Sequence, residues 1–329
     1  MKPRLLRCRR PRNHCVSAAE YRILRLCFLF TMSPAHAFTN PRLMLRSFAP
    51  ALFVFFWSTG FIAARGIVPH ADAQLFLLCR FTAVALILAI AATASRTRWP
   101  SPRQAVWHLL TGAVMMGLYL ALSYWAIAQG LPAGIMALMG ALQPLFTLLL
   151  MLSSGRERPT LSMALGLFIG FLGVVLVLLP RFENRALGAV DSASAVVGLL
   201  SVVALTLGTL AQHRLANDDL RTSGCLQNCG AAIIATLALC SVGTLRWDGS
   251  PVLWGTLVWA VLLLSIAAQS LLMWMLRHGE ATRVTALMLL VPPLAALFAF
   301  VLFKEALSAL QFVGFALALA GVVLARRTV

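Results

Sequence analysis

The chain has 329 residues, of which 60% are hydrophobic and 11% charged, and its mean hydropathy is +0.88. A soluble domain carries about a quarter charged residues, so the composition excludes a soluble fold and indicates an integral membrane protein. The formal net charge is +17. Beyond a basic N-terminal segment, however, the basic residues stand one to three at a time between apolar runs, which argues against a nucleic-acid partner.

Residues 1–46 form that basic segment. Its apolar stretch, Ile23–Phe30, has eight residues, which is too short to cross a bilayer. We expect a disordered cytoplasmic extension. The alternative is that translation starts naturally at Met32 or Met44, so that residues 1–31 are not part of the native protein.

Ten apolar runs follow, and each is long enough to span about 30 Å of hydrocarbon as a helix. They predict an all-α integral membrane protein with ten transmembrane helices joined by short loops. The predicted spans are Phe48–Ala64, Ala73–Ala94, Val106–Gln129, Ala133–Ser153, Leu161–Leu179, Ala193–His213, Leu220–Gly243, Val252–Leu276, Ala281–Phe303 and Leu307–Leu324.

The two halves of the chain repeat each other. Residues 133–176 match residues 281–324, with Pro144 on Pro293 and the Gly-Val-Val-Leu of 173–176 on that of 321–324. Internal repeats in a membrane chain are typical of secondary transporters. Five spans per half is an odd number, so the second half enters the membrane from the opposite side. We therefore expect two inverted five-helix repeats, 47–180 and 193–327, joined by an external linker, 181–192.

Lysine and arginine in the loops predict the orientation. With a cytoplasmic N-terminus, the inner loops and the C-terminal tail carry eleven basic residues and the outer loops five. The inner residues are Arg96, Arg98, Arg103, Arg156, Arg158, Arg214, Arg221, Arg277, Arg283, Arg326 and Arg327. The outer residues are Arg65, Arg181, Arg185, Arg246 and Lys304. Both termini are expected in the cytoplasm.

Charged residues are almost absent from the span interiors. All ten acidic residues lie in loops or near span ends, so a carboxylate proton relay at the bilayer centre is not expected, although proton coupling by other groups stays open. Arg80 is the exception, about eight residues into its span. It could contact an anion or form a gating pair, with Asp72 as one partner, or it could be structural.

Prolines interrupt equivalent spans of the two halves. Pro144 lies in the fourth predicted span, and Pro292 and Pro293 lie in the ninth. Each removes a backbone hydrogen bond, and in lipid the freed carbonyl must find another partner. These prolines are predicted to act as hinges beside a cavity near the midplane. Polar, aromatic and soft side chains at similar depth are predicted to line a substrate cavity with Arg80: Trp57, Ser58, Tyr119, Gln143, Thr206, Thr209, Gln269, Thr285 and Met288.

Small residues and cysteines have simpler readings. Gly166, Gly170 and Gly173 lie at helix-packing spacing in the fifth span, and Gly314 and Gly321 repeat part of that pattern in the tenth. They predict either a homodimer seam through spans five and ten or packing within one chain. The seven cysteines show no metal-ligand spacing, and neither a metal nor a cofactor is expected.

Several of these residues resemble the EamA-type permeases of the drug/metabolite transporter superfamily. The resembling residues are the Trp-Ser-Thr-Gly-Phe of 57–61, Arg80-Phe81, Gln143-Pro144 with Glu157, and Pro293, Glu305, Gly314 and Gly321. The resemblance covers Ala49–Arg327. It implies a ten-helix bundle of two inverted repeats, with a cavity lined by spans one, three, four, six, eight and nine. It also implies efflux of metabolites, amino acids or drugs across the inner membrane of a bacterium, with both termini cytoplasmic.

Three functions are compared on this basis. The sequence favours a secondary transporter of small organic solutes, working by alternating access. A non-transporting scaffold or sensor stays open because no coupling carboxylate is present within a span. A membrane-embedded enzyme is disfavoured because no GxSxG or HExxH motif and no paired intramembrane acids occur.

Overall fold

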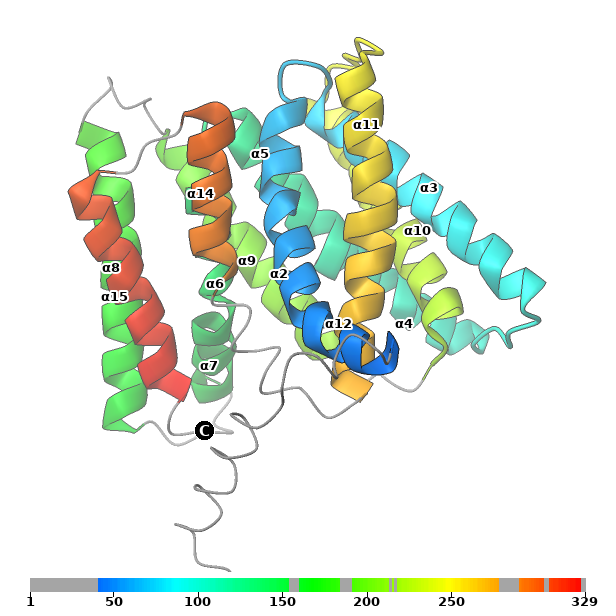
Figure 1. Ribbon diagram of the computed structural model, residues 1–329, viewed down its shortest axis with the longest axis horizontal. Helices are drawn as coiled ribbons and strands as arrows, with labels where there is room; N and C mark the ends of the chain where they lie inside the picture. The colour runs from blue at the N-terminus through cyan, green and yellow to red at the C-terminus, as the bar shows by residue number, and fades with distance from the viewer. Residues whose placement is uncertain are drawn as a thin grey trace, which may run out of the picture. The chain divides into compact units, whose positions relative to one another are not determined.

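The computed structural model describes residues 41–153, 160–183, 191–212, 215, 218–277, 290–304 and 308–326. The chain divides into two compact units, Met1–Ala49 and Pro50–Val329. Of the first unit, only residues 41–49 are described, as the start of a helix. The second unit is a bundle of helices (Figure 1), and among the described residues its β-structure is limited to a single bridge between Ala71 and Trp247.

The helices of the described ranges follow one another with short connections. They are α2 (Pro41–Ile67), α3 (Ala73–Ala94), α4 (Pro102–Gly112), η2 (Ala113–Leu118), α5 (Tyr119–Ala128), α6 (Ala133–Ala141), α7 (Gln143–Ser153), α8 (Leu161–Glu183), α9 (Ser192–Gln212), α10 (Leu220–Val242), α11 (Pro251–Trp259), η5 (Ala260–Ala267), α12 (Ala268–Arg277), α14 (Val291–Phe303) and α15 (Ala309–Arg326).

Six helical segments are long and apolar enough to cross a membrane, judged by length and composition over the described residues. They correspond to predicted spans one, two, three, six, seven and eight. Four shorter apolar helices, 133–147, 161–177, 291–303 and 309–324, coincide with the remaining predicted spans. The all-helical, multi-pass membrane class is therefore confirmed.

The fourth and ninth spans differ from the continuous helices that the sequence predicts. The fourth is divided into α6 and α7 at Leu142, directly before Gln143 and Pro144. In the ninth, α14 begins at Val291, so that Pro292 and Pro293 stand in its first turn. A first-turn proline loses no helical hydrogen bond, because that N–H has no acceptor within the helix.

The third and eighth spans each contain a π-helical segment, which the sequence did not predict. η2 lies between α4 and α5, and η5 lies between α11 and α12. A shift by the repeat offset of 149 residues (113 + 149 = 262) places the start of η2 inside η5. The two halves therefore share this irregularity, a kind that occurs often at functional sites.

The glycine-rich helices α8 and α15 pack against each other within one chain. A Cβ added at Gly173 would lie 2.6 Å from the carbonyl oxygen of Gly314, and one at Gly321 would lie 2.6 Å from that of Gly166. Glycine is needed here because the two backbones touch. The intramolecular reading of these glycines accounts for the contact, and a homodimer through α8 and α15 would have to use their other faces.

Helices of the two halves also meet in the body of the bundle. α3 packs along α10, and α10 also packs against α4 and η2. A Cβ at Gly112 would overlap the backbone of Gln227, and one at Gly230 would overlap that of Leu109. These close approaches bring polar groups of the two halves together.

Candidate functional site: a buried arginine and two polar clusters between the halves

Arg80 of α3 is the charged group set deepest among the described helices, and it is 8% exposed. Its Nε donates to the hydroxyl of Ser265 at 3.0 Å, and a terminal nitrogen donates to the hydroxyl of Tyr124 at 3.4 Å. Tyr124 in turn donates to the carbonyl oxygen of Gly60, also at 3.4 Å. The arginine thus joins α2, α3 and α5 of the first half to η5 of the second.

Local structure holds both hydroxyl partners of Arg80 in place. Ser265 donates to the carbonyl oxygen of Ala260, five residues earlier, at 3.0 Å. Five residues is the π-helical interval, so the irregular turn orients this hydroxyl. The ring of Tyr124 stacks on that of Phe76, with centroids 6.3 Å apart.

No acidic side chain forms an ion pair with Arg80 among the described residues, where the ion pairs found are two histidine–aspartate pairs. Asp72, considered above as its partner, has another role. The carboxylate of Asp72 caps α3 by accepting from the N–H groups of Gln74 and Leu75. It also accepts from Thr244 on the following half. The pairing of Asp72 with Arg80 is therefore wrong.

A second polar contact lies at the break of the fourth span. The amide of Gln143 donates to the hydroxyl of Thr209 on α9 at 2.9 Å. Tyr119 lies nearby on the other side of the break, because a Cβ at Gly140 would be 3.9 Å from the Tyr119 hydroxyl and 3.7 Å from the ring of Phe61. The structure thus brings together two pairs of predicted positions, Gln143 with Thr209 and Tyr119 with the helix break.

The other predicted residues are placed separately. Ser58 is buried and donates to the carbonyl oxygen of Val54 at 2.7 Å and to that of Val291, in the first turn of α14, at 3.4 Å. Thr206 is buried and bonds its own helix at Val202. Half-buried positions are Trp57, Pro144 and Gln269; Pro292 is buried and Pro293 is exposed. Thr285, Met288, Glu157 and Glu305 lie outside the described residues.

Two contacts between the first and eighth spans were missed by the sequence analysis. The indole N–H of Trp259 donates to the hydroxyl of Thr59 at 2.9 Å, and Ser265 holds Arg80. Neither serine nor threonine is distinctive in an apolar run, and the partners are about 200 residues apart. The only signal in the sequence was the depth of Arg80 itself.

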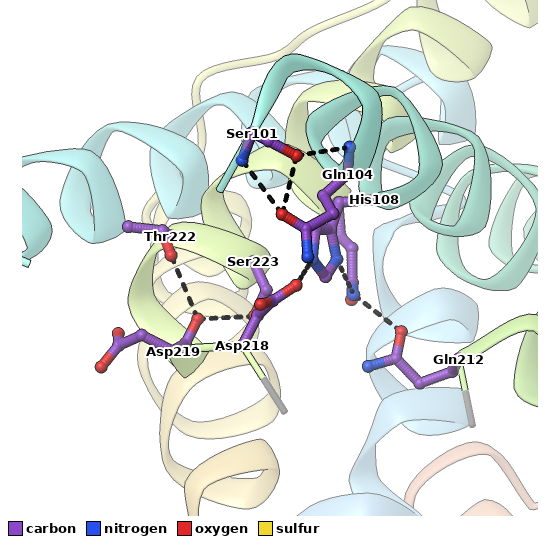
Figure 2. A network of polar contacts seen from close by, with 9 residues as sticks. Ser101, Gln104, His108, Gln212, Asp218, Asp219, Thr222 and Ser223 are labelled. Atoms are coloured by element: carbon purple, nitrogen blue, oxygen red, sulfur yellow. Dashed lines mark hydrogen bonds and ion pairs between the residues drawn. The ribbon is translucent and has the colours of Figure 1, made fainter. Parts of the chain in front are cut away.

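A cluster around His108 joins the halves at one end of the bundle (Figure 2). His108 of α4 is fully buried, and its Nε2 lies 2.7 Å from a carboxylate oxygen of Asp218. The amide of Gln227 donates to Gln212 at 2.7 Å and faces Nδ1 of His108 at 3.4 Å. With Nδ1 accepting, the proton of a neutral His108 lies on Nε2 and is directed at Asp218.

A cluster around His70 joins the halves at the opposite ends of α3 and α10. Nδ1 of His70 lies 2.6 Å from a carboxylate oxygen of Asp248. Arg246 donates to the carbonyl oxygens of Val68 and Ala71, and Asp72 binds Thr244. The backbone N–H of Ser250, followed by the hydrogen bond from His70, lowers the pKa of Asp248 from its ordinary value.

The two histidine–aspartate pairs occupy related positions in the repeat. Asp218 follows His70 by the repeat offset of 148 residues (218 − 70), and each directly precedes the span that starts with α10 or α3. Their partners, His108 and Asp248, lie near the starts of α4 and α11, whose N-caps Ser101 and Ser250 are 149 residues apart. The same junction is thus built twice, with histidine and aspartate exchanged.

Comparisons with known proteins give a consistent result. The sequence model of the EamA-like transporter family matches residues 47–179 and 192–327. Protein PecM of Dickeya dadantii is 28% identical over 46% of this chain and 49% of its own length, so only about half of that relative is matched. A probable terminal-alkyne amino-acid exporter of Streptantibioticus cattleyicolor is 29% identical over 85% of this chain and 92% of its own length.

Two further similarities extend over most of the chain. An uncharacterized transporter of Archaeoglobus fulgidus is 25% identical over 83% of this chain and 95% of its own length. One solved crystal structure superposes with a TM-score of 0.58 at 21% identity, covering 85% of this chain and 96% of the other. At that identity the structural likeness concerns the fold alone.

Proposed function

Because the chain belongs to the EamA-like transporter family, we propose that it is a secondary transporter that exports small organic metabolites across the inner membrane of a bacterium. In this proposal ten helices form two inverted five-helix repeats with both termini cytoplasmic. Solute is carried by alternating access, in which the halves rock about a site between them.

The observation that carries this proposal is the pair of helix starts at equivalent places in the two halves. α7 begins at Gln143 and α14 at Val291, and their offset of 148 residues (291 − 143) is that of the repeat. Discontinuous helices at matching positions of a repeat are typical of transporter binding sites. Gln143 and Ser58 lie beside these two starts and are proposed to face the solute.

The solute class follows from the residues and the relatives. The predicted site is largely apolar with few polar groups, which suits small organic molecules. One relative is named as a probable amino-acid exporter, so amino acids are the first solutes to test. Transport is preferred to catalysis because the family and the named relatives are transporters.

Release of solute from vesicles tests this proposal. The purified chain is reconstituted in liposomes loaded with a mixture of the twenty amino acids, simple carboxylic acids and cationic dyes, and release is followed by mass spectrometry. We expect release of at least one solute class compared with protein-free liposomes. Gln143→Ala and Trp57→Ala should slow that release while the thermal stability of the protein is retained.

The scaffold or sensor alternative makes the opposite prediction. Folded protein that releases no member of the mixture faster than protein-free liposomes would contradict the transporter proposal. Release that is unchanged in both variants would retain transport and remove these two residues from the site.

A further inference from the structure

We propose that Arg80 binds a carboxylate group of the transported solute, so that the substrates are organic molecules carrying a single negative group at one end. This inference rests on the transport function proposed above and specifies its substrate class. Its basis is the contrast between the burial and charge of Arg80 and the neutral partners around it.

The first step concerns the cost of this charge. Arg80 is 8% exposed and lies within α3, one of the six helices able to cross the membrane. A charged side chain at such depth is unfavourable unless it is paired. The hydroxyls of Ser265 and Tyr124 supply dipoles but no opposite charge, and no carboxylate pairs with Arg80 in the described ranges.

The second step concerns the unused donors. A guanidinium group has five N–H donors in a planar fork. Ser265 uses the Nε donor and Tyr124 uses one donor of a terminal nitrogen. About three donors therefore have no acceptor among the described residues. A carboxylate can accept two of them in the parallel arrangement that arginine favours.

The third step concerns the type of anion. One arginine supplies one positive charge, which a carboxylate balances, whereas a phosphate monoester would bring about one further negative charge. The aromatic groups around the arginine are neutral: Tyr124 stacks on Phe76, and Trp259 bonds Thr59 on the adjoining turn of α2. A carboxylate attached to an apolar or aromatic body fits these surroundings better than a phosphate does.

The fourth step connects binding with motion. Arg80 belongs to the first half, and Ser265, which orients its Nε, belongs to the second. A carboxylate on the remaining donors would therefore be held at the boundary of the halves. Ser265 is a positioning residue in this scheme, because it acts on the solute through Arg80.

The experiment compares solutes that differ only at the acid group. The purified chain in detergent is mixed with L-leucine, L-leucinamide and isoamylamine, and with L-phenylalanine, L-phenylalaninamide and phenethylamine. 4-Methylpentanoate and 3-phenylpropanoate test the carboxylate without an amine. Binding is measured by the shift in thermal unfolding and by calorimetry, and release of the same solutes is measured from liposomes.

We expect a carboxylate to bind at least about tenfold more tightly than its amide or amine. Arg80→Gln should remove this difference, and Arg80→Lys, which keeps the charge in case the glutamine variant does not fold, should retain part of it. Ser265→Ala should weaken carboxylate binding and leave binding of the amides unchanged. Arg98→Gln, an exposed arginine in the loop after α3, is the matched control and should behave like the wild type.

The outcomes separate this inference from the transport proposal. Equal binding and release of acids and amides, or no binding of any carboxylate in the panel, would overturn the role of Arg80, and release would still report on transport. Carboxylate binding that depends on Arg80 but is accompanied by no release would support the inference and contradict transport.

Discussion

At the residue scale, the two histidine–aspartate pairs form the same contact in different surroundings. The side chains of His108 and Asp218 are 0% and 25% exposed, and those of His70 and Asp248 are 28% and 39% exposed. Water can replace the lost partner of an exposed pair but not that of a buried one. Equal contact distances therefore do not imply equal contributions to stability.

His108→Ala is expected to lower the free energy of unfolding by about 1–3 kcal/mol, because Asp218 and Gln227 lose a buried partner. His70→Ala is the matched control and should have a smaller effect. The measurement is the thermal unfolding midpoint of both variants in detergent at neutral pH. An equal fall in both would show that the burial of His108 does not matter to stability.

Arg80 shows how far a single residue can be understood from the sequence. Its depth follows from counting eight residues into an apolar run, and that count identified it as a candidate. Its partners could not be predicted, because Tyr124 and Ser265 are 44 and 185 residues away. The orientation of Ser265 further depends on a π-helical turn, for which the sequence carries no marker. Asp72, the nearest acid in sequence, caps its own helix instead.

At the element scale, α8 and α15 show a glycine pattern being used within one chain. Spacing alone fits a homodimer or an internal crossing, since both need small residues on one face. The structure decides for these glycines, because their missing side chains are occupied by the backbone of the other helix. The exposed faces of these helices carry large apolar residues such as Phe168 and Phe312, as expected beside lipid.

Gly321→Ala should therefore destabilise the chain by about 1–3 kcal/mol through overpacking. Gly255→Ala is the matched control, because Gly255 is also helical and a Cβ there meets nothing within 4 Å. The control should leave the unfolding midpoint unchanged or slightly higher. Size-exclusion chromatography with light scattering adds a second reading. A change of oligomeric state at unchanged stability would instead assign Gly321 to a homodimer seam.

Helix breaks were predictable in place but not in form. The prolines at 144 and 292–293 fixed the positions, since proline cannot donate to the preceding turn. Whether the chain bends, stops or restarts depends on the tertiary partners of the freed groups. Gln143 reaches Thr209 and Ser58 reaches Val291, and both partners lie far along the chain. The expectation of helices interrupted in mid-span was correct for α6 and α7, whereas α14 starts at its prolines.

At the scale of the whole molecule, the two polar clusters mark the two ends of the bundle. Near His108 lie the α3–α4 connection, with Arg96 and Arg98, and the start of α10, with Arg221. Near His70 lies Arg246, whose guanidinium is directed to the backbone carbonyls of Val68 and Ala71. Basic loop residues are retained on the cytoplasmic side of membranes. The end of the bundle with His108 is therefore predicted to be cytoplasmic.

Reporter fusions test this orientation. Green fluorescent protein fused after Val329 should fluoresce, and alkaline phosphatase at the same point should be inactive, because the C-terminus is predicted to be cytoplasmic. Fusions to a chain cut after Gly249, in the connection between α10 and α11 beside His70, should give the opposite pair of results. Active phosphatase after Val329 would reverse the orientation. Activity at both points would contradict the odd number of spans between them, and with it the inverted relation of the two halves.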